Sequence, residues 1–294
     1  MTVISASRRT DLVAFFPAWL AGALRAGRAR VLAPSGRLFV ADLRPEAVHT
    51  IVLWSKDFTN LLQNADGLRE ALEAYGQTYA HFTVTGLGGS ALEPGAPPVG
   101  KALSQIPELV SFLRHPGRLS VRFDPVVFWR EGTIRRTNLE AFERVARAAA
   151  AAGATDLRTS FAQWYGKAVR RMRDRGLEVF DPGESEKIDL ASRLAETTWR
   201  LGLRLWSCSQ NFLVRATGIR ASACIDGRLL ADLHPRRAAA PTAKDRTQRT
   251  ECGCTISVDI GSYAQACPHA CLYCYANPRR APAGEGGGIS DPEA

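Results

Sequence analysis

The sequence lacks long hydrophobic runs, although 46% of its 294 residues are hydrophobic. No window reaches the roughly 18 uninterrupted apolar residues that a membrane-spanning helix needs. The first nine residues also lack the order of a signal peptide, in which a basic segment precedes an apolar one. We therefore expect a cytoplasmic protein without a membrane partner, whose hydrophobic content suffices for the core of one or two domains.

A glycine-rich dinucleotide-binding turn is also missing, because no Gly-x-Gly-x-x-Gly pattern follows the first predicted strand. Apolar, strand-like segments instead alternate with amphipathic helical segments. This alternation is typical of parallel βαβ units and predicts an α/β fold, a TIM-like full or partial (β/α) barrel. The predicted strands are 3–7, 49–55, 79–85, 119–123, 156–161, 204–208 and 255–260; the predicted helices are 11–26, 59–75, 101–114, 139–152, 164–175 and 188–201; a hairpin is predicted at 31–32 and 38–40.

Disulfides are not expected, because the seven cysteines are odd in number and bunched at metal-ligand spacings. Three of them, Cys267, Cys271 and Cys274, have the spacing C-x3-C-x2-C. A short loop with this spacing presents three thiolates to three irons of a 4Fe–4S cluster and leaves the fourth iron without a protein ligand. A structural zinc site, with His269 as a fourth ligand, is the alternative.

The other four cysteines form a candidate second metal site. Cys208, Cys224, Cys252 and Cys254 suffice as the ligands of a second 4Fe–4S cluster or of a zinc ion. We favour iron, because the first cluster already implies iron–sulfur assembly. In the alternative interpretation, Cys208 and Cys224 are simply small buried residues.

The segment from Cys267 to Cys274 resembles the cluster motif of the radical S-adenosylmethionine (SAM) enzymes, including the aromatic Tyr273 before the last cysteine. The resemblance implies that SAM binds the open iron through its amino and carboxylate groups, with Tyr273 against the adenine. It implies that an electron from a reducing partner such as flavodoxin or ferredoxin yields methionine and a 5′-deoxyadenosyl radical, which acts on an unknown substrate. This motif usually follows the first barrel strand, so we expect a permuted barrel with the last strand beside the first.

A narrower resemblance extends over nearly the whole chain. Residues 4–11 (ISASRRTD), 123–125 (FDP) and 244–249 (KDRTQR) are similar to the family of domain of unknown function 1848. That family implies an iron–sulfur protein of radical-SAM type without a settled substrate. The cysteine run is also similar to that of spore photoproduct lyase, so a DNA-repair enzyme is one alternative. A non-catalytic zinc or iron–sulfur protein for binding or electron transfer is another.

Charged residues follow several predicted strands, at the edge where barrels of this kind gather their chemistry. They could bind an anionic substrate or the SAM carboxylate, or form buried ion pairs. A glycine-rich step after the third strand could hold the SAM amino group, or be an ordinary loop. The candidates are Arg8, Arg9, Lys56, Arg122 and Asp124 for catalysis, and Gly86, Gly88 and Gly89 for the cofactor.

The predicted organisation is a barrel at 1–234, a basic loop at 235–250, a final strand and cluster loop at 251–278 packed on the barrel mouth, and a disordered tail at 279–294. The formal net charge of +9 allows a nucleic-acid partner. A coding bias toward arginine and alanine explains the same charge. The charge alone therefore establishes no partner.

Overall fold

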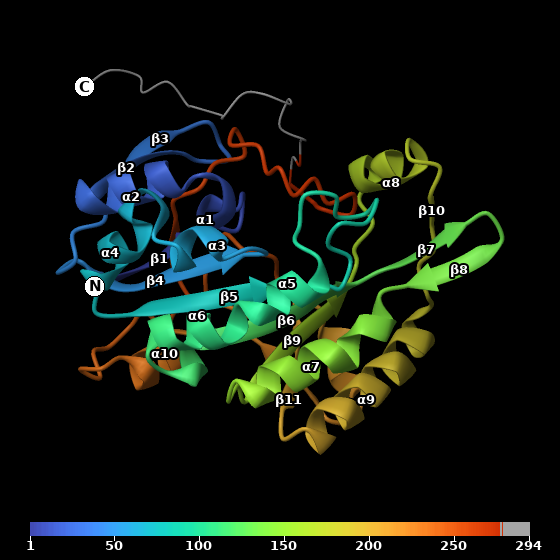
Figure 1. Ribbon diagram of the computed structural model, residues 1–294. Coiled ribbons are helices and arrows are strands. Elements are labelled where there is room, and N and C mark those ends of the chain that lie inside the picture. Colours follow the sequence, from blue (N-terminus) through green and yellow to red (C-terminus); the bar gives the residue numbers. More distant parts are fainter. Residues whose placement is uncertain (277, 279–294) are drawn as a thin grey trace.

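The computed structural model describes residues 1–276 and residue 278, so the predicted tail at 279–294 lies outside the described residues. An eight-stranded sheet runs through the middle of the molecule, and all its neighbouring strands are parallel (Figure 1). In order across the sheet, the strands are β12 (Ile219–Ser222), β11 (Arg204–Cys208), β9 (Asp156–Phe161), β6 (Leu119–Val126), β5 (Thr78–Thr83), β4 (Val48–Ser55), β1 (Thr2–Ala6) and β13 (Val258–Asp259).

The order of the strands follows the chain, except that the last strand, β13, lies beside the first. Ile4 of β1 pairs with Val258 of β13, which confirms the predicted pairing of the final strand. The α/β class with a parallel sheet is also confirmed. Within the described part of the chain β12 and β13 do not pair with each other, so no closed barrel is found. The segment before β13 instead contacts the residues after β12, where Thr255 N donates to Ile225 O at 2.9 Å.

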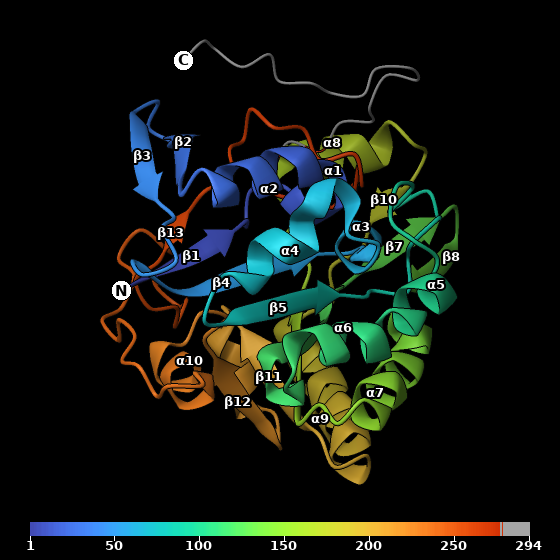
Figure 2. The same ribbon diagram turned by 60° about the vertical axis from the view of Figure 1, so that its left-hand side comes forward.

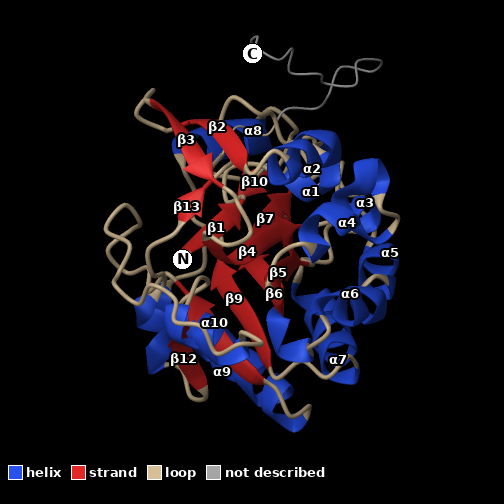
Figure 3. Cartoon of the chain, turned by 90° about the vertical axis from the view of Figure 1, so that its left-hand side faces the viewer, coloured by secondary structure: helices blue, strands red, loops and turns tan. Residues whose placement is uncertain are grey.

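Helices cover the outer face of the sheet, and Figure 3 shows α3 to α7 lying along one side of the strands. Predicted helix 11–26 is divided at Pro17, which lacks the N–H that a continuous helix would use. Among the described residues no helix is long and apolar enough to cross a membrane. The helices are α1 (Leu12–Phe15), α2 (Pro17–Arg25), α3 (Thr59–Leu62), α4 (Leu68–Glu73), α5 (Val99–Ser104), α6 (Ile106–Leu113), α7 (Phe142–Ala151), α8 (Gly166–Arg173), α9 (Glu184–Arg200) and α10 (Gly227–Leu233), with short 3-10 turns at Ala65–Gly67, Pro116–Arg118, Leu139–Ala141 and Asn211–Arg215.

Two smaller sheets flank the main one (Figure 2). Strands β2 (Arg28–Leu32) and β3 (Leu38–Asp42) form the predicted hairpin. Strands β7 (Phe128–Glu131), β8 (Ile134–Thr137) and β10 (Glu178–Val179) form an antiparallel sheet that was not predicted. Strand β12 and helix α10 were also missed.

The two faces of the main sheet differ in chemistry. The outer face is apolar, and Ile51 and Phe82 on it are fully buried in the core beneath the helices. Their neighbours along the same strands, Val52 and His81, occupy the opposite face because side chains alternate along a strand. Val52 packs there with Cys252 in a separate cluster that also contains other cysteines. The inner face is therefore partly polar and is covered by the C-terminal part of the chain.

Candidate functional site

A cavity of about 310 Å³ lies at the carboxyl ends of the central strands, and all seven cysteines line it. Residues that end or follow β1, β4, β6, β9 and β11 contribute to the same lining. The cavity therefore brings together side chains that are separated by more than 200 residues in sequence. Of the predicted candidates, it contains Arg8, Arg9, Lys56, Arg122, Asp124 and Tyr273 beside the cysteines.

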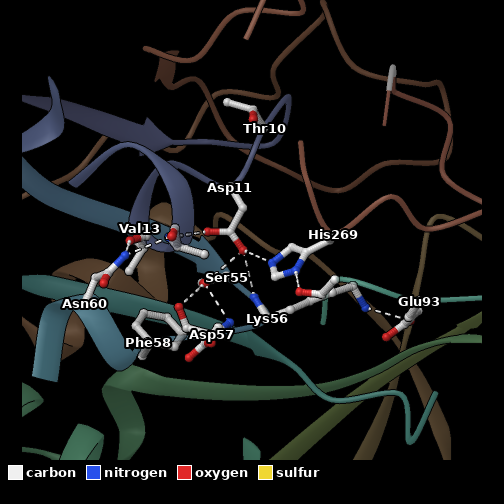
Figure 4. A network of polar contacts seen from close by, with 12 residues as sticks. Thr10, Asp11, Val13, Ser55, Lys56, Asp57, Phe58, Asn60, Glu93 and His269 are labelled. Carbon is white, nitrogen blue, oxygen red and sulfur yellow. Dashed lines mark hydrogen bonds and ion pairs between the residues drawn. The ribbon is translucent and has the colours of Figure 1, made fainter. Parts of the chain in front are cut away.

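The cysteine loop is fastened to the sheet through His269 (Figure 4). His269 Nε2 lies 2.7 Å from Asp11 Oδ2, and His269 Nδ1 lies 3.0 Å from Gly95 O. Asp11 Oδ2 also accepts hydrogen bonds from Ser55 Oγ and Lys56 N, both at 2.9 Å. Both imidazole nitrogens face oxygen acceptors, so neither is available as a metal ligand.

Lys56 forms a buried ion pair with Glu93. Lys56 Nζ lies 2.9 Å from Glu93 Oε1 and 3.1 Å from the hydroxyl oxygen of Tyr273, which also donates to Glu93. Thr85 Oγ1 donates to the same carboxylate at 2.7 Å. Burial alone would raise the pKa of Glu93, but the Lys56 ammonium and the two hydroxyl donors lower it below its usual value. The charge of Lys56 is thus satisfied within the protein, as the ion-pair interpretation expected.

Arg8, which follows β1, and Arg122, on β6, both approach the indole of Trp54 on β4, with their guanidinium carbons 5.3 Å and 5.2 Å from its ring centroid. Arg122 donates to Asp124, and Ser160 donates to the same carboxylate. Burial would lower the Arg122 pKa, but Asp124 and the nearby thiol groups raise it above its usual value. Nη2 of Arg8 and Nε of Arg122 are buried and have no hydrogen-bond partner among the described residues.

Hydrogen bonds to the Asp259 carboxylate hold β13 against the end of β1. Its Oδ2 accepts from Ser5 Oγ and Arg8 N, both at 2.9 Å, and its Oδ1 accepts from Ser7 Oγ at 2.8 Å. Arg9 is held nearby, because its Nη1 donates to Gly261 O at 2.8 Å. These hydrogen bonds fix the segment that leads into the cysteine loop. Sequence reasoning missed Asp259, because its partners lie more than 250 residues away in the chain.

The cysteines form two groups, and the first is Cys267, Cys271 and Cys274 of the C-terminal loop. Cys271 and Cys274 pack with Leu92 and Trp129, in the part of the cavity wall near α8. The red C-terminal segment reaches this helix in Figure 1, where Arg171 Nε donates to Leu272 O at 2.9 Å.

The second group contains the four remaining cysteines. Sγ of Cys208 lies 3.2 Å from Sγ of Cys224, and Sγ of Cys254 accepts from Ile225 N at 3.4 Å. In the described part of the chain, no three His, Cys, Asp or Glu side chains converge on a position that would hold a single metal ion. The second group is Cys208, Cys224, Cys252 and Cys254.

The three candidate glycines do not line the cavity. Gly86 has a φ of +80°, and a Cβ there would lie 2.3 Å from the Cβ of Ala141. A Cβ at Gly88 would lie 1.9 Å from Pro97 O, and Gly89 also has a positive φ. Close packing accounts for glycine at Gly86 and Gly88, and the positive φ accounts for it at Gly89. Their role in holding the SAM amino group stays a prediction.

These features define an α/β protein whose cysteine-lined cavity lies at the carboxyl edge of a parallel sheet. The chain belongs to the family described as domain of unknown function (DUF1848), whose sequence profile matches residues 3–276. No curated protein matches it. A solved structure to which it is similar, a crystal structure of D-hydantoinase, is 10% identical with a TM-score of 0.33 over 81% of this chain and 45% of that one. The chain thus spans less than half of that structure, and a likeness this low carries no argument about fold or function.

Proposed function

We propose that this protein is a radical-SAM-type enzyme on a permuted partial (β/α) barrel. The observation that carries the proposal is the donor set of the C-terminal loop. Cys267, Cys271 and Cys274 line the cavity, while both nitrogens of His269 are occupied by Asp11 and Gly95. The loop therefore offers three thiols without a fourth ligand of its own, which fits a 4Fe–4S cluster with one open iron.

The same observation disfavours a structural zinc site in this loop. Structural zinc is almost always held by four protein ligands in a closed tetrahedral site. Within the loop, His269 is the residue that would supply the fourth ligand. Both of its ring nitrogens are already engaged by Asp11 and Gly95. A non-catalytic zinc protein would therefore need a fourth ligand from elsewhere in the fold.

When bound, a 4Fe–4S cluster with an open iron supplies the coordination site and the electron for cleaving SAM to methionine and a 5′-deoxyadenosyl radical. The chain's own residues position the reactants and limit the access of water. Arg9, Arg122 and Trp54 line the cavity and offer cationic and aromatic surfaces to SAM and substrate. Tyr273 is 9% exposed, and Glu93 and Lys56 hold its hydroxyl group so that the orientation of the ring is fixed.

The test is to reconstitute the protein anaerobically with iron and sulfide and then to add SAM with dithionite or with reduced flavodoxin. We expect 5′-deoxyadenosine, and we expect Cys271→Ala to abolish it. Thr250→Ala is the control and should retain the activity, because Thr250 is exposed and its side chain has no hydrogen bond with another described residue. Intact SAM in the presence of a fully assembled cluster would contradict the proposal.

A nucleic-acid substrate is a second candidate, favoured by the composition of the cavity lining. Tyr165 and Tyr275 line the cavity and are 41% and 39% exposed, so their rings are accessible for stacking on bases. Arg249 adds a cation to the same lining. We expect single-stranded DNA to bind at low salt and to be released as salt rises, with weaker binding after Tyr165→Ala. Fluorescence anisotropy checks this, and an absence of binding at low salt removes the DNA-repair alternative.

A further inference from the structure

Two cations near the second cysteine group, the buried Arg158 and the half-buried Arg8, have no carboxylate partner for their guanidinium groups among the described residues. Arg158 is 5% exposed, and its guanidinium donates only to hydroxyl groups, those of Ser222 at 2.9 Å and Ser120 at 2.5 Å. Arg8 Nη1 reaches Ser257 Oγ at 3.4 Å, and its Nη2 has no partner. Neither guanidinium forms an ion pair with a carboxylate of the described residues. Because burying an unpaired charge is costly, these cations indicate an anion nearby.

The four thiols of the second group are the groups that could supply this negative charge. Ser222, which receives the hydrogen bond from Arg158, ends the strand that leads to Cys224. Arg8 and Arg122 line the same cavity as all four of these cysteines. Cations that follow β1 or lie on β6 and β9 are thus placed around the second cysteine group.

We propose that Cys208, Cys224, Cys252 and Cys254 bind a second iron–sulfur cluster, whose negative charge is balanced by Arg8, Arg122 and Arg158. Four thiolates are the usual ligand set of a 4Fe–4S cluster, and such a centre carries a net negative charge. This site goes beyond the proposed function, because it uses none of the residues of the C-terminal C-x3-C-x2-C loop.

A zinc ion fits the second group less well. No three donors of the described residues converge as the ligands of a single ion would, and all four sulfur atoms belong to residues that line the open cavity. Structural zinc sites are closed, and they bring their ligands together around one centre. A disulfide is not formed either, because the 3.2 Å contact between Cys208 and Cys224 exceeds the roughly 2.05 Å of an S–S bond.

The experiment measures iron and acid-labile sulfide in the anaerobically reconstituted full chain and in two double variants. We expect about eight irons in the wild-type protein, as for two 4Fe–4S clusters. Cys252→Ala/Cys254→Ala should lose about half of the iron, and Cys271→Ala/Cys274→Ala should lose the other half. Thr250→Ala, two residues before Cys252 and exposed, is the matched control and should keep all of it.

The outcomes separate this proposal from the proposed function. If Cys252→Ala/Cys254→Ala loses iron and Cys271→Ala/Cys274→Ala does not, the result would support the second cluster and contradict a cluster on the C-terminal loop. An unchanged iron count in Cys252→Ala/Cys254→Ala, or zinc in stoichiometric amount on the wild-type chain, would overturn the second cluster.

A measurement on the unmodified protein covers the case in which a variant does not fold. The Mössbauer spectrum of the protein reconstituted with 57Fe should contain two cluster components, and added SAM should change only one of them, because four cysteine ligands leave no iron of the second cluster open. A single component that accounts for about four irons would overturn the proposal.

Discussion

The two sides of the cavity treat buried charge differently. On the side of the C-terminal cysteine loop, the charged side chains have partners within the protein. Lys56 forms an ion pair with Glu93, and the Asp11 carboxylate contacts His269 Nε2. On the side of the second cysteine group, Arg122 is paired with Asp124. Among the described residues, the guanidinium groups of Arg8 and Arg158 donate hydrogen bonds only to hydroxyl groups. Both sides lie in the interior, where an unpaired charge is costly.

This difference distinguishes charges that are neutralised within the protein, such as that of Lys56, from those of Arg8 and Arg158, for which we propose a bound anionic group. The paired side is complete within the protein, and its ion pairs hold the cysteine loop against β1 and β4. On the other side, the proposed second cluster supplies the balancing negative charge. The paired side should therefore be damaged by losing one charge, whereas the unpaired side should tolerate the loss until its bound group is present.

The largest effect is expected for Asp11→Asn. Asp11 Oδ2 accepts from His269, Ser55 and the backbone of Lys56, and an amide cannot accept from all three with the same strength. Breaking one member of a buried charged network costs about 3 to 5 kcal/mol, which we expect as the loss in the free energy of unfolding in urea. The cysteine loop should also loosen, so that Cys267 reacts faster with iodoacetamide.

Asp66→Asn is the control for this substitution. Asp66 is exposed, and its side chain makes no hydrogen bond to any residue that the structure describes. We expect its stability to remain within about 0.5 kcal/mol of the wild type. If Asp11→Asn were equally mild, the contact between Asp11 and His269 would not be what anchors the loop.

The next effect is expected for Glu93→Gln, which leaves the Lys56 ammonium buried without a counter-charge. We expect a loss of about 2 to 3 kcal/mol in the free energy of unfolding, in line with the cost of a charged group left unpaired. Replacing both partners with apolar residues, in Lys56→Met/Glu93→Leu, should cost less than Glu93→Gln alone. The comparison of the single and double variants measures this pair directly.

The stabilisation by Glu93 should depend on pH. The pKa of Glu93 is lowered in the folded state, so its contribution is complete above the unfolded-state value of about 4.3 and is lost as the pH falls toward the folded-state value. The stability difference between wild type and Glu93→Gln should therefore shrink below about pH 4. A difference that grows in acid would contradict the lowered pKa.

A smaller effect is expected for Tyr273→Phe, which removes one hydroxyl donor to Glu93 and keeps the aromatic ring. A hydrogen bond of this kind contributes about 1 to 2 kcal/mol to stability. Tyr75→Phe is the matched control, since its buried hydroxyl donates to Leu43 O at 2.5 Å far from the cavity. Both variants should lose similar stability in thermal unfolding and should still form 5′-deoxyadenosine. Loss of this product in Tyr273→Phe alone would assign the Tyr273 hydroxyl a direct role in the reaction.

The sequence predicted the central sheet well, because its strands carry regular apolar patterns. The predicted bounds of β9 and β11 agree with the structure. The predicted helix at 59–75 is instead broken near Gly67, which adopts a φ of +71°. Strand β12 was missed because its four residues, Ile219–Ser222, are too short to show a period. The hairpin β7–β8 had a usable signal, because Gly132 and Thr133 form a two-residue connection between its strands.

The candidate site could be predicted from the sequence where a residue type by itself indicates a chemical role. Cysteines stand out by type and spacing, and all seven line the cavity. Glu93 and Asp259 were missed because a carboxylate is common and gains meaning only from its partners. Those partners lie as far away as Ser5, which is 254 residues from Asp259.

The smallest effect on the metal-free protein is expected for Arg8→Met, and this variant is the sharpest test of the comparison. The guanidinium of Arg8 has no carboxylate partner in the described part of the chain, so removing its charge should change the free energy of unfolding of the apoprotein by less than about 1 kcal/mol or increase it. In the reconstituted protein the same variant should release about half of its iron faster to a chelator, because the second cluster loses a balancing cation. Arg9→Met is the control. Arg9 Nη1 donates to Gly261 O, just after β13, so this variant should leave that release rate unchanged. A strongly destabilised Arg8→Met apoprotein would mean that Arg8 is already paired within the fold and that the two sides of the cavity do not differ.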